Sequence, residues 1–173
     1  SSLVGSEMCI RDSRHTGSYL QGHPDMKHIP GIDMSSGSLG QGVSAAVGIA
    51  AAGKFDNKDY RVYTLTGDGE IQEGQVWEAL MFASHRKLDN LCVIVDNNGL
   101  QLDGTIDEII GPNPLDEKFE SFGCHVIKAD GHDFDSLEKA FNEAKTVKGQ
   151  PTVIIAKTVK GKGVSFMENN VSW

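Results

Sequence analysis

The chain has 173 residues, enough for one domain with a full hydrophobic core and too few for two domains of ordinary size. Hydrophobic residues make up 39% and charged residues 23%, which is typical of a soluble globular protein, and no apolar run approaches the length of a membrane span. The net charge of −8 comes from 24 acidic and 16 basic residues without a long basic run, so we expect no nucleic-acid-binding surface.

The cysteines and the absence of a visible secretory signal indicate the cellular location. Cys9, Cys92 and Cys124 are widely separated and mostly in apolar stretches, as expected of reduced thiols. We therefore expect a cytoplasmic protein.

Residues 1–13 (SSLVGSEMCIRDS) show neither helical nor strand periodicity. They resemble the translated read-through of a sequencing adaptor, so we expect a non-native and poorly ordered segment. The domain proper then covers residues 14–173.

The segment 17–25 (GSYLQGHPD) is polar and contains Gly and Pro, which predicts a surface loop. His23 precedes Pro24, which biases its backbone toward an extended conformation and limits where its ring can point. A single loop histidine is more often solvated than functional, although imidazole is a general proton-transfer group. Both interpretations of His23 stay open on these residues alone.

Residues 39–52 are predicted to form a buried helix, because most of them are small and would let the helix pack closely against a sheet. Ser38 is the expected N-cap. The free N–H groups of the helix N-terminus would then lie near a ligand pocket. Gly40 and Gly42 fit either contact with a ligand or tight packing.

Two short runs rich in β-branched residues, 61–66 (RVYTLT) and 91–95 (LCVIV), have the composition of strands buried on both faces. The segment 74–88 between them predicts a helix. Strand, helix and strand in this order form a crossover with parallel strands. The polar turns that follow the two strands therefore meet at the carboxyl edge of the sheet, where ligands bind in open α/β folds.

The first turn is 67–70 (GDGE), and the second strand ends in Asn97 and Asn98. Asp68 offers a carboxylate oxygen and Asn98 an amide oxygen, which are hard ligands that suit Mg²⁺. Gly67 and Gly69 would let the backbone approach an anion closely. Together the turns predict a magnesium-held phosphate ligand, whereas for either one alone an ordinary turn is the better interpretation.

Three acidic residues follow the Gly-Asp-Gly of the first turn. Glu70 and Glu73 fit a simple role in complementing a helix dipole. Glu78 lies between Trp77 and the apolar residues 79–82, so we expect its carboxylate to be desolvated and either paired or protonated.

The sequence pattern of the C-terminal third predicts helices and strands with a structural role. We expect helices at 116–122 and 134–145, a strand at 125–129, and a further parallel strand at 152–156. The loop 158–163 would either line a diphosphate site or simply expose its lysines.

The spacing of the two turns resembles the thiamin diphosphate motif, which runs from Gly-Asp-Gly to Asn-Asn; Asp68 and Asn98 lie 30 positions apart. Residues 20–25 (LQGHPD) and 36–42 (SGSLGQG) resemble the transketolase family. This resemblance covers nearly all of residues 14–173. It implies an α/β fold with three α/β/α layers and a central, mainly parallel sheet, forming a diphosphate-binding domain that is truncated at both ends.

The resemblance also implies roles for individual residues. His23 would contact the cofactor and the hydroxyls of the sugar, and Glu73 and Glu78 would share protons between subunits. Mg²⁺, or another divalent cation such as Ca²⁺, would be bound by Asp68, Asn98 and the main-chain carbonyl of Leu100. The residues expected to contact thiamin diphosphate are His23, Gly37, Leu39, Gly67, Asp68, Gly69, Asn98 and Leu102.

Transketolases transfer a two-carbon ketol unit from a ketose phosphate to an aldose phosphate, as in the pentose phosphate pathway. The resemblance implies a partner, either the pyrimidine-binding domain or a C-terminal subunit of a split enzyme, in a homodimer or heterotetramer. That partner supplies the glutamate that activates the cofactor, so we expect this chain alone to be inactive. Two alternatives stay open: another thiamin diphosphate enzyme (deoxyxylulose-phosphate synthase or a 2-oxo acid dehydrogenase), or a non-catalytic fragment that serves as a scaffold.

Overall fold

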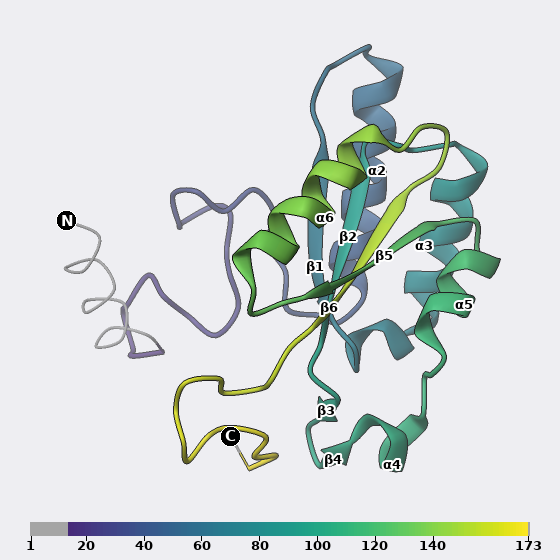
Figure 1. Ribbon diagram of the computed structural model, residues 1–173. Coiled ribbons are helices and arrows are strands. Elements are labelled where there is room, and N and C mark those ends of the chain that lie inside the picture. Colours follow the sequence, from purple (N-terminus) through teal and green to yellow (C-terminus); the bar gives the residue numbers. More distant parts are fainter. Residues whose placement is uncertain (1–13, 173) are drawn as a thin grey trace.

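The computed structural model describes residues 14–172, so the expectation for residues 1–13 lies outside the described residues. Residues 14–40 form loops and turns. Within the described part of the chain, no helix has both the length and the apolar character needed to cross a bilayer. In chain order the elements are α2 (Gln41–Phe55), β1 (Val62–Gly67), the 3₁₀-helix η1 (Glu70–Gln72), α3 (Gly74–His85), β2 (Leu91–Asn97), β3 (Leu100–Gln101), β4 (Gly104–Thr105), α4 (Ile106–Ile110), α5 (Leu115–Ser121), β5 (His125–Asp130), α6 (Phe134–Thr146) and β6 (Thr152–Lys157) (Figure 1).

Four strands form one parallel sheet in the order β1-β2-β6-β5. Val62 of β1 pairs with Leu91 of β2, and Cys92 of β2 pairs with Thr152 of β6. Helix α3 connects β1 to β2, which confirms the predicted crossover. Because all four strands run the same way, their carboxyl ends and the polar turns that follow them lie along one edge of the sheet.

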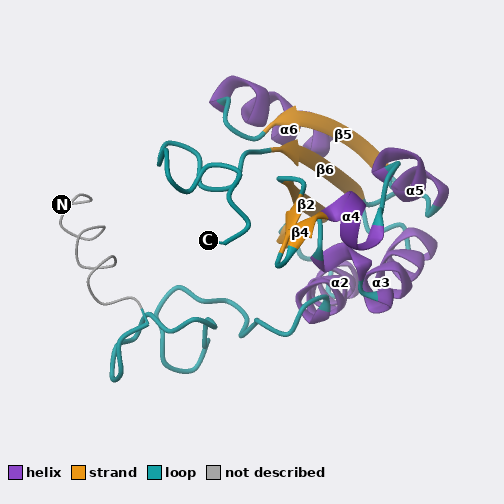
Figure 2. Cartoon of the chain, turned by 90° about the horizontal axis from the view of Figure 1, so that it is seen from below, coloured by secondary structure: helices purple, strands orange, loops and turns teal. Residues whose placement is uncertain are grey.

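Helices cover both faces of this sheet (Figure 2). Successive side chains of a strand point to opposite faces, and the two hydrophobic clusters follow that alternation. Leu91 and Val93 pack in the cluster that contains α2, α3 and α5, whereas Cys92 and Ile154 pack in the cluster that contains α6. The expected three-layer arrangement around a parallel sheet is thus confirmed.

The predicted elements differ from the structure mainly at turns and caps. The helix expected from residue 39 begins at Gln41, because Gly40 has a left-handed backbone with φ of 79°. The assignment of Ser38 as N-cap is wrong, since Gly40 holds that position and no side chain caps the helix. The hairpin β3–β4 and helix α4 were not predicted; Thr105 and Glu108 form a reciprocal cap at the start of α4.

Gly40→Ala is expected to destabilise the fold by about 1–2 kcal/mol, because a left-handed backbone disfavours residues with a Cβ. The added methyl group would also lie 3.0 Å from side-chain carbons of Gln75 and Glu73. Urea unfolding measures the difference. A Gly40→Ala protein as stable as the wild type would contradict this account of the turn.

Gly48→Ala provides the matched control. Gly48 lies inside α2, the helix that Gly40 precedes, and an added Cβ there would meet no atom within 4 Å. This substitution is expected to stabilise the protein by about 0.5–1 kcal/mol, because glycine inside a helix is less favourable than alanine.

Candidate functional site

The two polar turns meet at the carboxyl edge of β1 and β2. Asp68 directly follows β1 and is only 1% exposed. Its Oδ2 accepts a 2.7 Å hydrogen bond from the main-chain N–H of Gly99, in the turn after β2. The Oδ1 of Asn98 accepts a 2.9 Å hydrogen bond from the N–H of Leu100. The structure therefore brings residues 67–69 and the turn at Asn98 together.

Asp68 is a buried carboxylate that has no salt-bridge partner among the described residues. Burial is the main cause that raises its pKa above the ordinary value, and the nearby Asp96 raises it further, while the N–H groups of Gly99 and Gly69 oppose the shift. No Lys or Arg within residues 14–172 forms a salt bridge with Asp68; the lysine salt bridges of this part go to other acids. Lys157 lowers this pKa slightly without forming a salt bridge, so a bound cation would neutralise a charge that no salt bridge within residues 14–172 offsets.

The chemistry of the available donors suits a cation that is only partly bound by protein. Among the described residues, no three His, Cys, Asp or Glu side chains are grouped as a self-sufficient metal site would require. This edge instead offers the carboxylate of Asp68, the amide oxygen of Asn98 and main-chain carbonyls. Mg²⁺ commonly combines such a small protein set with phosphate oxygens and water.

The β3–β4 hairpin is held against the first turn by a pair of glutamines. The Nε2 of Gln72 donates to Oε1 of Gln101 at 2.9 Å and to the carbonyl of Ile110 at 3.0 Å. Gly69 packs against Gln101, where an added Cβ would lie 3.1 Å from Cγ. Two predicted site residues belong to this hairpin, Leu100 in β3 and Leu102 in its turn, and Leu102 is 81% exposed.

His23 and Gly37 are in contact although they lie in different loops. Gly37 has φ of 135°, and an added Cβ would lie 1.6 Å from Nδ1 of His23, so only glycine fits against this ring. His23 is an exposed residue, which leaves it accessible to a ligand. Gly37 and Leu39 also line an open pocket of about 790 Å³ that extends along the outer side of β1.

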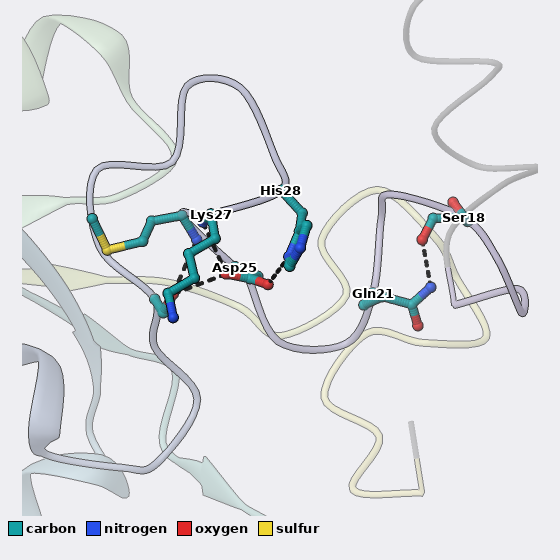
Figure 3. Close-up of polar contacts among 7 residues, drawn as sticks. Ser18, Gln21, Asp25, Lys27 and His28 are labelled. Atoms are coloured by element: carbon teal, nitrogen blue, oxygen red, sulfur yellow. Dashed lines mark hydrogen bonds and ion pairs between the residues drawn. The ribbon is translucent and has the colours of Figure 1, made fainter.

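Asp25 organises the loop that follows His23 and Pro24 (Figure 3). Its carboxylate pairs with Nδ1 of His28 at 2.5 Å and accepts a 2.9 Å hydrogen bond from the N–H of Lys27. These bonds, that of His28 first, hold the pKa of Asp25 below its ordinary value. The hydroxyl of Ser35 donates to the same carboxylate at 3.4 Å. Asp25 thus closes a loop between residues 25 and 35 that has no regular secondary structure.

Glu70 connects the two parts of the site. One carboxylate oxygen accepts a 2.9 Å hydrogen bond from the N–H of Gly40, and the other accepts a 3.2 Å bond from the N–H of Gly67. Sequence reasoning assigned Glu70 only a dipole role and missed this link. No local signal relates residue 40 to residue 70, so only the fold could reveal it.

Glu73 and Glu78 are both accessible on this chain. The expected desolvation of Glu78 is therefore wrong for the described residues. The neighbouring residue of α3, Trp77, points toward the core instead and stacks on Phe119 with ring centroids 5.0 Å apart. One residue further along a helix of 3.6 residues per turn, Glu78 points away from that contact. Glu73 is the N-cap residue of α3 and lies beside Gly40.

The loop after β6 is anchored at the same edge. The hydroxyl of Thr158 donates to Asp96, the acid that influences Asp68. The N–H of Val159 donates to Nε2 of His132 at 2.7 Å. The loop 158–163 therefore begins beside the turn after β2, as its position after a parallel strand predicts.

Asp68→Asn is expected to raise the free energy of unfolding at neutral pH, because asparagine keeps an acceptor for Gly99 and removes a buried charge. The raised pKa means that the folded protein binds this proton more tightly than the unfolded chain. The wild type therefore loses stability as the pH rises from the ordinary value of 3.8 through the raised pKa, and the variant lacks that loss. Urea unfolding between about pH 4 and pH 7 tests this, and a variant less stable than the wild type throughout would contradict it.

Comparison with known proteins shows a consistent set of relatives. The family profile described as "Transketolase, thiamine diphosphate binding domain" matches residues 3–172. The 6-deoxy-6-sulfo-D-fructose transketolase subunit of Clostridium sp. (strain MSTE9) is 47% identical over 156 residues, which cover 90% of this chain and 57% of that protein. Transketolase of Homo sapiens is 49% identical over 172 residues, which cover 97% of this chain and 26% of the human protein.

The fold agrees with these sequence matches. The crystal structure of transketolase from Campylobacter jejuni superimposes with a TM-score of 0.87 at 35% identity, covering 94% of this chain and 26% of that one. The chain thus spans little more than half of the Clostridium relative and about a quarter of the longer transketolases. The chain belongs to the transketolase family and contains its thiamine diphosphate-binding domain.

Proposed function

We propose that this chain supplies the diphosphate and metal site of a transketolase, which transfers a two-carbon ketol unit from a ketose phosphate to an aldose phosphate. Asp68 carries the proposal, because at the edge where the two turns meet it is a buried carboxylate without a salt-bridge partner in the part of the chain that the structure describes. The match to the thiamine diphosphate-binding domain supports the cofactor, and relatives named as transketolase subunits support the reaction class.

The cation in this proposal is Mg²⁺ or another divalent ion such as Ca²⁺. It would be held by side-chain oxygens of Asp68 and Asn98 and by the main-chain carbonyl of Leu100. The amide oxygen of Asn98 accepts one hydrogen bond from the N–H of Leu100, and its second lone pair remains for a cation. Diphosphate oxygens would occupy further coordination positions.

When bound, thiamin diphosphate would supply the carbon nucleophile for breaking and forming the carbon–carbon bond. The main chain at Gly67 and Gly69 would face its phosphates, and Gly37, Leu39 and Leu102 its rings. The accessible ring of His23 would contact the cofactor and hydrogen-bond the hydroxyls of the sugar.

Catalysis would require a second domain. The pyrimidine-binding domain, or a C-terminal transketolase subunit, would supply the glutamate that activates the cofactor. The carboxylates of Glu73 and Glu78 are accessible and could share protons with this partner. Two relatives are named as subunits, that of Clostridium sp. and an apulose-4-phosphate transketolase subunit of Actinobacillus succinogenes, which supports a partner on a separate chain.

The complete enzyme would be a cytoplasmic homodimer or heterotetramer that acts on sugar phosphates, as in the pentose phosphate pathway. Deoxyxylulose-phosphate synthases and 2-oxo acid dehydrogenases share the cofactor motif, but the transketolase profile over residues 3–172 favours the first assignment. The remaining alternative, a fragment that serves only as a scaffold, predicts no binding of the cofactor.

Asp68→Ala is expected to abolish the magnesium-dependent binding of thiamin diphosphate, because it removes the one acidic ligand of the proposed metal site. Titration calorimetry with and without Mg²⁺ measures this. Leu100→Ile is the matched control: it keeps the main-chain carbonyl and should bind as the wild type does. Undiminished binding by Asp68→Ala would refute the metal site.

The purified chain with thiamin diphosphate and Mg²⁺, but without a partner, is expected to show no ketol transfer from a ketose phosphate to an aldose phosphate. The reason is that the activating glutamate lies on the partner domain. A complete transketolase in the same coupled assay provides the positive control. Turnover by the isolated chain would overturn the requirement for a partner.

A further inference from the structure

Glu70 is a half-buried acid whose two oxygens accept main-chain N–H groups from segments far apart in the sequence. Oε1 bonds the N–H of Gly40 at 2.9 Å, 30 residues away, and Oε2 bonds the N–H of Gly67 at 3.2 Å. Within residues 14–172 no salt bridge involves this carboxylate. Its contacts are therefore with the backbone on either side.

The pairing of β1 explains why Gly67 needs such a partner. Val62 and Asp68 donate their N–H groups to carbonyls on the β2 side, at 2.8 Å and 3.2 Å. In a strand the direction of the N–H alternates from residue to residue, so Gly67 directs its N–H to the outer side of β1, away from β2. On that side the carboxylate of Glu70 accepts the hydrogen bond that a neighbouring strand would otherwise accept, one residue before Asp68.

At the start of α2, the N–H of Gly40 needs an acceptor in the same way as the N–H of Gly67. It has a left-handed backbone and no side-chain cap, so its N–H would otherwise lack a protein acceptor. The carboxylate also complements the positive end of the helix dipole. A second bond joins the same regions, from Nε2 of Gln75 to the carbonyl of Leu39 at 3.1 Å.

We propose that Glu70 is a positioning residue that sets the loop of residues 36–40 relative to Asp68. The loop carries Gly37 and Leu39, which face the rings of the cofactor in the proposed function, and Asp68 binds the metal at the other end. Glu70 acts through Gly40 and Gly67, to which its two oxygens are hydrogen-bonded, and its side chain lies beside the pocket that Gly37 and Leu39 line. The inference rests on the proposed function for its ligand, and on the two hydrogen bonds for its geometry.

Two variants separate this role from a dipole effect. Glu70→Asp keeps the charge but is shorter by one methylene group, so it cannot span both N–H groups. Glu70→Gln keeps the length but turns one acceptor into a donor that faces an N–H. If the bridge between the two N–H groups matters, both variants should bind thiamin diphosphate more weakly, and to the same degree. If Glu70 only complements the helix dipole, Glu70→Asp should bind as the wild type does, because it keeps the charge.

The experiment compares two ligands by calorimetry in the presence of Mg²⁺: thiamin diphosphate, and inorganic pyrophosphate, which lacks the rings. Both Glu70 variants are expected to weaken the binding of thiamin diphosphate about tenfold or more, as the loss of a hydrogen bond to a charged group implies. Pyrophosphate binding should change less, because it depends on Gly67 but not on the 36–40 loop. Glu138→Gln, on the distant helix α6, is the matched control and should bind both ligands as the wild type does.

The outcomes distinguish this proposal from the proposed function. Equal weakening of both ligands together with a lowered unfolding midpoint would show a merely structural role and overturn the inference, as would unchanged binding of thiamin diphosphate. A wild-type chain that binds neither ligand would overturn the proposed function and, with it, this role. Even then, amide hydrogen exchange tests whether Glu70 makes the two hydrogen bonds. Protection of the N–H groups of Gly40 and Gly67 should fall in Glu70→Gln, and unchanged protection would show that the bridge is absent.

Discussion

The parallel pairing of β1 with β2 is the constraint on which the whole site depends. It places two turns that are 30 residues apart at one edge and sets Asp68 against the N–H of Gly99. Parallel pairing requires a long crossover, and α3 provides it while packing Trp77 against Phe119. The hydrophobic side chains of the sheet therefore do more than stabilise the fold. They hold the carboxylate of Asp68 in a position where it is buried and where residues 14–172 offer it no salt bridge.

Carboxylates that accept main-chain N–H groups recur where this chain lacks regular structure. Asp25 closes the loop of residues 25–35, Asp68 holds the turn after β2, and Glu70 joins the start of α2 to the end of β1. An ionised side chain makes a stronger acceptor than a neutral one, which suits it to loops without a hydrogen-bond ladder. Part of the negative charge of the protein is thus structural.

The site also illustrates a conflict between stability and ligand binding. A buried, ionised Asp68 destabilises the folded chain near neutral pH, and a cation would remove that cost. The same edge leaves Leu102 and the ring of His23 accessible, where a packed core would cover them. These features suit a surface that is completed by a ligand, and in the proposed function also by a partner domain.

Sequence alone determined the order of the strands and helices around the crossover and the meeting of the two turns, because β-branched runs, helix-forming segments and turn residues are local signals. The motif spacing led to the cofactor, and residues 20–25 and 36–42 led to the family that the comparisons confirm. Only the tertiary structure decided that Glu70 rather than Ser38 serves the start of α2, that His23 lies against Gly37, and that Glu78 is accessible. Each of these depends on which remote segments pack together. No single stretch of the sequence predicts that α2 packs beside the turn after β1.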